Sequence, residues 1–440
     1  MGLYSNYNGI YNNMYNLDVP LSIVPKPSAT IEANRIQQER VKNNQVVYNW
    51  GLGANPLSAP EIIQEAMYKH SHQKDYYSPN GIEPLAKIIA SRESVAEYRI
   101  STSNVIIAPG LKQLLQDIQV VFGGPIVHVV PHWVSYSEQT IIHKIDTFKI
   151  YTKKKNKFQL SVDDVHDFIK KNPSLDEKMK LIILNNPTNP TGLSYTDTQL
   201  LDLAVVFKKY NFVVFSDEVY LGNTYNKQRS SIAKYLPKQT IRASSLSKEF
   251  GLGGYRLGWA VFPDSLLQLK KAMYAVGTSS YTCASVPIQY AALTALEYGL
   301  QVKDFLDIGQ KIFSTAASYI FKEFNRLGLS DHKPDSAWYF FLDFSKYKNK
   351  LKDKGILTSQ DLNESLARYK GLIFVPGVAF GLPEESLYLR ASFVDFDPKE
   401  AMLWAKNVKV SQDILTDKVA PKWLNKILKS ITILEEYLCS

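Results

Sequence analysis

LIILNNPTNPTGLSYTDTQLLDLAVVFKKYNFVVFSDEVY, residues 181–220, is the stretch that decides the predicted fold. It begins with a strand-length apolar run at 181–184 and approaches its end with a second one, FVVF, at 212–215. A helical pattern occupies 196–210 between them. Strands that are apolar throughout and alternate with helices are typical of a mainly parallel sheet that helices cover on both faces. We therefore predict an α/β fold.

The same alternation continues on both sides of this stretch. Further strand-like runs are VIIA (105–108), PIVHVV (125–130) and GWAVF (258–262), and LKQLLQDIQVVF (111–122) has a helical pattern. Beyond about residue 300 the pattern is helical and then gives the strand-like AWYFFLDF (337–344) and SLYLRASF (386–393). A chain of 440 residues exceeds the usual size of one hydrophobic core. We expect three parts: an N-terminal arm with part of a small domain at 1–50, a large domain at 51–300, and a small α+β domain at 301–440.

The charge of the chain raises the question of a nucleic-acid partner. The formal net charge is +9, and the densest basic run, Lys153–Lys157, lies between FKIY and FQLS. We predict that this run forms a solvated hairpin, because charged turns between strands are common. Since no zinc-finger spacing or aromatic RNA-binding signature accompanies it, we expect no nucleic-acid partner.

The number of cysteines and the hydropathy of the chain restrict the class of protein further. Cys283 and Cys439 are too few for a disulfide framework. No apolar run reaches the length of a membrane span, and the first 20 residues lack the pattern of a signal peptide. We expect a cytoplasmic protein without a membrane partner. The seven histidines do not pair with acids or cysteines at metal-binding spacing, so we predict no metal site.

A lysine in the segment SSLSKEFGLGGYRLGWA (244–260) has an unusual context. Ser245 and Ser247 precede Lys248, and Arg256 follows eight residues later. A lysine that forms a Schiff base must be desolvated or close to other cations, so that its amine is neutral. A phosphate group nearby requires hydroxyl donors and a guanidinium, which the same segment supplies. A single lysine is ordinarily a surface charge, but this context favours a covalent cofactor site.

Polar residues also follow two of the predicted strands directly. Asp217 ends FVVFSD, and Tyr220 comes three residues later. A buried carboxylate at a strand end needs a partner, and the residues leave open a pyridinium nitrogen or a helix cap or loop group. Asn189 lies between Pro187 and Pro190. Its amide either donates to a phenolate oxygen or belongs to a simple Pro/Asn turn.

Three other positions have both a functional and a structural interpretation. Gly110, between a strand and a helix start, suits a phosphate bound by free N–H groups and the helix dipole, although any such turn uses glycine. Trp133 either stacks on a flat ring or packs in the core. Arg390 interrupts an apolar strand, and its fork suits either a ligand carboxylate or an internal salt bridge.

These stretches occur in the order found in fold-type-I enzymes that use pyridoxal 5′-phosphate (PLP). The chain resembles the class I/II aminotransferase family from about residue 45 to its last helix, most specifically in NNPTNPTG, SDEVY, SLSK followed by Arg256, and YLRASF. The resemblance implies a large domain with a mainly parallel, seven-stranded sheet between helices and a smaller α+β domain. It also implies PLP as cofactor, an amino acid and a 2-oxo acid as substrates, and a homodimer with shared active sites.

The resemblance further implies a role for each matching residue. Lys248 would carry PLP as a Schiff base and move the proton between the substrate Cα and the cofactor. Asp217 would bond the pyridine nitrogen, and Arg390 would bind the substrate α-carboxylate beside the backbone of Gly53. Asn189 and Tyr220 would contact the ring oxygen of the cofactor, and Trp133 would contact its ring face. The residues that would contact the phosphate are Gly110, Leu111, Lys112, Ser245, Ser247, Arg256 and, from the neighbouring subunit, Tyr76.

The residues leave several points open. Tyr77 adjoins Tyr76 and competes for the same place, and Leu111 stands where many relatives have a small residue, so the packing there must differ. The same motifs serve PLP enzymes that act as β-lyases, cyclopropane-forming synthases or decarboxylases, and a PLP-binding regulatory protein without catalysis is a further alternative. We predict an aminotransferase that moves an amino group from an L-amino acid to a 2-oxo acid, with donor and acceptor undetermined.

Overall fold

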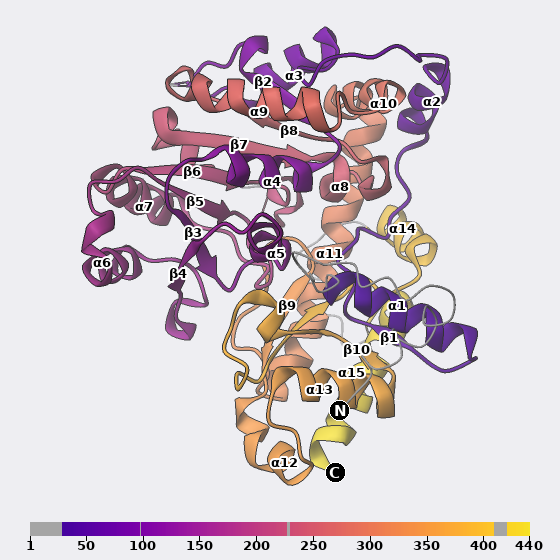
Figure 1. Cartoon of the computed structure of the whole chain (residues 1–440). Helices are drawn as coiled ribbons and strands as arrows, with labels where there is room; N and C mark the ends of the chain where they lie inside the picture. The colour runs from indigo at the N-terminus through magenta and orange to yellow at the C-terminus, as the bar shows by residue number, and fades with distance from the viewer. Residues whose placement is uncertain (1–28, 97, 227–228, 409–419) are drawn as a thin grey trace, which may run out of the picture.

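The computed structural model describes residues 29–96, 98–226, 229–408 and 420–440. Figure 1 shows a sheet covered by helices in the N-terminal two thirds of the chain and a smaller part formed mainly by the C-terminal third. The beginning of the predicted arm, residues 1–28, lies outside the described residues.

A seven-stranded sheet is the centre of the larger part. Its strand order is β2-β8-β7-β6-β5-β3-β4. Neighbouring strands from β7 to β4 run parallel, whereas β8 is antiparallel to both of its neighbours. The predicted mainly parallel sheet is therefore confirmed, with one reversed strand. The bounds of its strands are β2 (Val105–Ala108), β3 (Ile126–Val130), β4 (Thr147–Tyr151), β5 (Lys180–Asn185), β6 (Phe212–Asp217), β7 (Thr240–Ser245) and β8 (Gly258–Val261).

β6 shows why this sheet appears in the sequence as apolar runs. Val213 and Phe215 pack in one core with α4 (Leu111–Val121) and α9 (Leu267–Ser280). Val214 packs in a second core with α6 and α7 on the opposite face. Because successive side chains of a strand point to opposite faces, a sheet covered on both faces needs apolar residues at every position. Helices α2, α3 and α10 cover β2 and β8 on the second face.

Local chemistry sets where the connecting helices begin. Thr196 caps α7 because its hydroxyl accepts a 3.2 Å hydrogen bond from the Gln199 N–H, and the Gln199 side chain accepts one of 2.8 Å from the Thr196 N–H. This reciprocal pair fixes the start of the crossover between β5 and β6. The helices not yet given are α2 (Glu61–Lys69), α3 (Glu83–Glu93), α5 (Ser135–Ile142), α6 (Val162–Lys171), α7 (Asp197–Lys209), α8 (Leu246–Glu249) and α10 (Val286–Leu296).

The C-terminal part contains a three-stranded antiparallel sheet with the order β11-β12-β9. A short parallel pair, β1 with β10, joins the segment before residue 50 to this part. The Ser392 N–H donates to the Trp50 carbonyl at 2.7 Å, which holds residues 50–53 beside β12. The elements here are α1 (Ala29–Lys42), β1 (Tyr48–Asn49), α11 (Leu300–Arg326), β9 (Tyr339–Asp343), α12 (Lys348–Asp353), α13 (Ser359–Lys370), β10 (Leu372–Ile373), β11 (Val375–Pro376), β12 (Tyr388–Ser392), α14 (Pro398–Asn407) and α15 (Asn425–Cys439).

The prediction of a hairpin around the basic run 153–157 is wrong. Residues 158–161 form no strand, and the chain turns directly into α6. Lys153 lies 3.3 Å from the Asp164 carboxylate, and Lys154 lies 2.5 Å from that of Asp343. These ion pairs compensate the charges of two of the four lysines in this run. Among the described residues, no helix combines the length and the apolar character needed to cross a membrane.

Candidate active site

The predicted site residues follow strands that end at one edge of the large sheet. β2, β3, β5, β6 and β7 run in the same direction, so the loops behind them meet at their common carboxyl edge. β8 runs the other way, and its first residues, just after Arg256, therefore reach the same edge. The C-terminal part adds Arg390 from β12, and the segment before α2 adds Gly53.

Asp217 is the last residue of β6 and is 3% exposed. Its Oδ2 accepts a hydrogen bond of 2.5 Å from the hydroxyl of Tyr136, and its Oδ1 accepts one of 3.2 Å from the Val219 N–H. Burial raises the pKa of the Asp217 carboxyl to about 6, although the Tyr136 and Val219 bonds act in the opposite direction. A cationic partner would favour the ionised form of this carboxylate.

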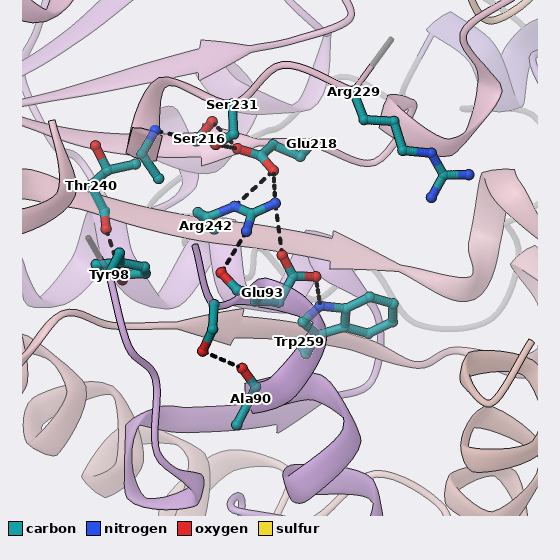
Figure 2. A network of polar contacts seen from close by, with 12 residues as sticks. Ala90, Glu93, Tyr98, Ser216, Glu218, Arg229, Ser231, Thr240, Arg242 and Trp259 are labelled. Carbon is teal, nitrogen blue, oxygen red and sulfur yellow. Dashed lines mark hydrogen bonds and ion pairs between the residues drawn. The ribbon is translucent and has the colours of Figure 1, made fainter. Parts of the chain in front are cut away.

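The next carboxylate, Glu218, belongs to a buried polar network with Arg242 (Figure 2). Its oxygens accept hydrogen bonds from the hydroxyls of Ser216 at 2.8 Å and Ser231 at 2.5 Å, and from Arg242 Nε at 3.0 Å and Nη2 at 2.8 Å. Arg242 also pairs with Glu93 at 2.9 Å, and Glu93 accepts from the Trp259 indole N–H at 3.0 Å. The network joins β6 to β7, β8 and α3, and so fixes the strand end that carries Asp217.

Lys248 lies in the short helix α8, directly after β7, and is half-buried. Its Nζ donates a hydrogen bond to the Gly53 carbonyl. The same nitrogen lies 5.6 Å from the ring centroid of Tyr220 and 5.9 Å from that of Trp338. The backbone carbonyl of Lys248 accepts from the Asn55 side chain at 3.2 Å. Residues 53–55 therefore hold this lysine at both its backbone and its amine.

The turn between β2 and α4 brings together the start of a helix and two cations. Gly110 has a φ of +91°, and a Cβ there would overlap the guanidinium of Arg256. Arg256 donates to the carbonyls of Gly253 at 2.8 Å and Pro109 at 3.3 Å. Burial, followed by the charge of Arg256, lowers the pKa of Lys112 in the first turn of α4. This arrangement of N–H groups and positive charges favours a bound phosphate.

Serines and a leucine complete the surroundings of this turn. The Ser245 hydroxyl caps α8 by accepting a 3.2 Å hydrogen bond from the Ser247 N–H. A Cβ at Gly258 would lie 2.5 Å from the backbone nitrogen of Leu111, so only glycine lets β8 approach α4 this closely. The Leu111 side chain is 6% exposed and packs in the core of the first sheet face, which explains how a large residue is accommodated here.

Arg390 is 1% exposed, on β12. It donates to the Asn189 Oδ1 at 3.4 Å and to the Gly51 carbonyl, and its guanidinium lies 4.7 Å from the ring centroid of Tyr339. Within the described ranges no carboxylate pairs with Arg390, and its Nε has no hydrogen-bond partner. Burial lowers its pKa below the usual value. Among these residues the internal salt bridge is therefore absent, and a buried guanidinium of this kind suits a carboxylate ligand.

Two hydroxyls and an amide lie between Arg390 and Lys248. The hydroxyls of Tyr220 and Tyr339 are 2.7 Å apart, and the Gly53 carbonyl, 3.3 Å from the Tyr339 hydroxyl, is a second acceptor for its one hydrogen. The Asn189 N–H donates to the Asn185 side chain at 2.7 Å, which fixes the loop. Because the Asn189 Oδ1 faces Arg390, its amide nitrogen is the group that donates elsewhere.

The remaining predicted residues differ in how the structure places them. The Trp133 ring is half-buried and meets Tyr136 edge-on, with centroids 5.7 Å apart, and the Lys112 ammonium lies 5.2 Å from its centroid. Trp133 thus lies next to Tyr136, the hydroxyl donor to Asp217. Tyr76 and Tyr77 are 87% and 39% exposed, so this chain leaves both outside the buried group.

Sequence reasoning missed Tyr136, and it considered Tyr339 only as one of several residues that could recognise the substrate side chain, without a bond to Tyr220. Tyr136 follows Trp133 by three residues at the start of α5, which is the spacing of one helical turn. That spacing is a signal, but it does not reveal that the hydroxyl reaches Asp217. Tyr339 lies in the aromatic run AWYFFLDF, where nothing distinguishes a hydroxyl that bonds Tyr220 from a core side chain.

The site as a whole combines an amine, a carboxylate and an unpaired guanidinium at the carboxyl edge of a parallel sheet. Such a combination is typical of α/β enzymes that act on small anionic substrates with the help of an amine-bound group. In the described part of the chain, no cluster of three or more His, Cys, Asp or Glu side chains is arranged to hold a metal ion.

Comparisons with known proteins agree with this class. Residues 45–401 match the family model for aminotransferase class I and II. A probable aspartate/prephenate aminotransferase of Aquifex aeolicus is 28% identical over 382 residues, covering 84% of this chain and 91% of the relative. An asparagine–oxo-acid transaminase of Streptococcus mutans is 27% identical over 350 residues, with coverages of 77% and 85%. The solved structure of an aspartate aminotransferase from Thermus thermophilus with maleate has a TM-score of 0.76 and 23% identity, and the match covers 94% of this chain and 97% of that one.

The chain belongs to the aminotransferase class I and II family. It is an aminotransferase, an enzyme that transfers an amino group to an oxo acid. The predicted family, fold class and type of enzyme are therefore confirmed.

Proposed function

We propose that Lys248 of this aminotransferase binds PLP covalently and that amino groups pass between an L-amino acid and a 2-oxo acid at this lysine. The observation that carries the proposal is the state of Arg390. A buried guanidinium without a carboxylate partner, near an amine held by Gly53, is what an α-carboxylate-binding site requires. The class of the enzyme indicates the type of substrate, and these residues indicate where we propose that the substrate binds.

The surroundings of Lys248 fit a ring with a phosphate at one end and a basic nitrogen at the other. Gly110, Arg256 and Lys112 offer backbone N–H groups and two positive charges for the phosphate. Asp217 offers a carboxylate whose pKa burial has raised to about 6 and which a protonated ring nitrogen would restore to its ionised form. When bound, PLP supplies an electron sink that makes the substrate Cα–H acidic.

The chain's own residues then have distinct tasks. Arg390 binds and orients the substrate α-carboxylate beside the backbone of Gly53. The amine of Lys248, once released, takes the proton from the substrate Cα and returns it, as a general base and acid. Tyr220 and Asn189 donate hydrogen bonds to the ring oxygen, and the remaining cofactor contacts that we propose are Leu111, Trp133, Ser245 and Ser247.

A homodimer belongs to the same proposal, with Tyr76 or Tyr77 reaching the phosphate of the neighbouring subunit. Their exposure in the single chain supports a role outside it. The proposal also includes a cytoplasmic location and the three parts 1–50, 51–300 and 301–440. The large sheet within 105–261 and the smaller one within 339–392 support this division.

Replacing the lysine tests the assignment of Lys248. Lys248→Ala should abolish the visible absorbance that PLP gives the wild-type protein and reduce turnover to background, because no other amine takes its place. Borohydride reduction followed by peptide mapping should label the peptide that contains Lys248. Lys171→Ala, on the exposed surface of α6, is the control and should behave as wild type. Turnover retained in Lys248→Ala would remove the basis of the proposal.

The amino donor is best identified with a panel. Aspartate and asparagine come first, because relatives at 27–28% identity are named for them. Glutamate and aromatic amino acids follow, since Trp338 and Tyr339 lie near the amine. Loss of the visible absorbance on mixing, with amino-group transfer to 2-oxoglutarate or pyruvate, identifies a donor. Pyruvate and ammonia formed without an acceptor would instead indicate elimination chemistry.

A further inference from the structure

Tyr339 makes contact with both halves of the proposed site, although no motif points to it. It begins β9, and its side chain is 1% exposed. Its hydroxyl lies 2.7 Å from that of Tyr220 and 3.3 Å from the Gly53 carbonyl, which also accepts from Lys248. The guanidinium of Arg390 lies 4.7 Å from the centroid of its ring. A single side chain thus joins the proposed cofactor contact to the proposed carboxylate clamp.

The number of hydrogens restricts how these groups bond. Each phenol hydroxyl carries one hydrogen, and either oxygen of the Tyr220–Tyr339 pair is able to donate in the 2.7 Å bond. If Tyr220 donates to Tyr339, it has no hydrogen left for a ligand oxygen. For Tyr220 to serve a cofactor, Tyr339 must direct its one hydrogen to Tyr220 at 2.7 Å, the shorter contact, rather than to the Gly53 carbonyl at 3.3 Å. The direction of this one hydrogen bond therefore decides whether Tyr220 can act.

The ring of Tyr339 has a second task. Arg390 has no carboxylate partner among the described residues, so its charge is supported by carbonyl and amide oxygens and by aromatic faces. A guanidinium over an aromatic ring gains more when it is desolvated than at a surface. Tyr339 is the nearer of the two rings beside it, since Phe380 is at 5.5 Å. Removing the ring should displace the guanidinium, whereas removing the hydroxyl should not.

We propose that Tyr339 is a positioning residue that orients the Tyr220 hydroxyl toward the cofactor and supports the Arg390 guanidinium for the substrate carboxylate. The proposal rests on the function assigned above to Lys248, Tyr220 and Arg390. It divides the side chain of Tyr339 into a hydroxyl that affects the cofactor and a ring that affects the substrate. Two substitutions separate these effects.

Tyr339→Phe removes the hydroxyl and keeps the ring. The pH midpoint of the visible absorbance of the PLP-loaded protein should rise by about 0.3 pH unit, because Tyr220 loses the donor that strengthens its own bond to the ring oxygen. The KM for amino donors should stay within about threefold of wild type, since the ring still supports Arg390. Tyr98→Phe is the matched control. Its hydroxyl is also buried and bonds only the Thr240 carbonyl among the described residues, at 3.2 Å (Figure 2), so the midpoint should not move.

Tyr339→Leu removes both the hydroxyl and the ring. The KM for amino donors and the dissociation constant of maleate should rise about tenfold, in addition to the spectral shift. An unchanged midpoint in Tyr339→Phe, or an equal shift in Tyr98→Phe, would overturn the proposal for the hydroxyl. An unchanged maleate affinity in Tyr339→Leu would overturn it for the ring. Lys248→Ala distinguishes these failures from failure of the function, because retained turnover there would remove the site itself.

Discussion

Arg242 and Arg390 are both buried and both lie on strands, yet their surroundings differ in one respect. Arg242 pairs with the carboxylates of Glu218 and Glu93 at 2.8 and 2.9 Å. Burial acts against its charge, but the two acids raise the pKa of Arg242 above its usual value. Arg390 pairs with no carboxylate in the described residues, and burial lowers its pKa. A charge neutralised within the fold belongs to its architecture, whereas the charge left without a counterion is the one that we propose binds a ligand.

Breaking the paired arginine should have the larger effect on stability. Arg242→Met leaves two buried carboxylates without their cation, so the free energy of unfolding should fall by about 3–5 kcal/mol. Urea denaturation of the cofactor-free protein measures this change. The double variant Arg242→Met, Glu218→Gln is the control and should recover part of the loss, because it removes one of the two uncompensated charges. An unfolding free energy within about 1 kcal/mol of wild type would contradict the role given to this pair.

Breaking the unpaired arginine should affect catalysis instead. Arg390→Met removes the proposed ligand of the substrate carboxylate, so kcat/KM should fall by about 10²–10³-fold. The unfolding free energy should stay the same or rise, because an uncompensated buried charge is lost and an apolar side chain of similar length replaces it. Steady-state kinetics and urea denaturation of the same preparation check both expectations. The comparison between the two arginines fails if Arg390→Met lowers stability as much as Arg242→Met does.

The neighbouring carboxylates Asp217 and Glu218 also differ in how many hydrogen bonds the fold gives them. Glu218 accepts four hydrogen bonds from Ser216, Ser231 and Arg242, whereas Asp217 accepts two, from Tyr136 and Val219. Because burial raises the folded-state pKa of Asp217 to about 6, the folded protein holds this proton more tightly than the unfolded chain does. The contribution of Asp217 to stability is therefore fully present at low pH and is lost as pH rises from about 4 to about 6.

The change in stability should be up to about 3 kcal/mol for the cofactor-free protein. It must be measured as the difference between wild type and Asp217→Asn, because other groups titrate in the same range. Burial lowers the pKa of His128 to about 3 and that of His132 to about 4, and these contributions increase stability as pH rises toward the usual histidine value. A wild-type minus Asp217→Asn difference that does not vary between pH 4 and 7 would show that Asp217 is already ionised.

The contrast also explains what the sequence could predict. Strand-end residues such as Asp217 and Asn189 were predicted because apolar runs locate strands, and parallel strands bring their carboxyl ends together. Lys248 and Arg256 were found because they lie within one short segment. The contacts of Tyr136 with Asp217 and of Tyr339 with Tyr220 were not predicted, because the partners lie 81 and 119 residues apart in the chain and a local pattern of residues does not show which distant residues meet. The ion pair of Lys154 could not be predicted for the same reason, since its partner Asp343 lies 189 residues further along the chain.

Because β8 is antiparallel to β7, some residues of the proposed site lie on one pair of bonded strands, whereas others lie on a different sheet. Lys248 and Arg256 lie between the end of β7 and the start of β8, two strands that are hydrogen-bonded to each other. The groups proposed for the Schiff base and for the phosphate thus lie on one connection between two paired strands. Arg390 stands on a different sheet. A displacement of β12 would move Arg390, the proposed ligand of the substrate carboxylate, while the distance between Lys248 and Arg256 stayed constant. For protein engineering, this means that the substrate contact proposed for Arg390 can be varied on β12 without rebuilding the proposed cofactor support in residues 245–258.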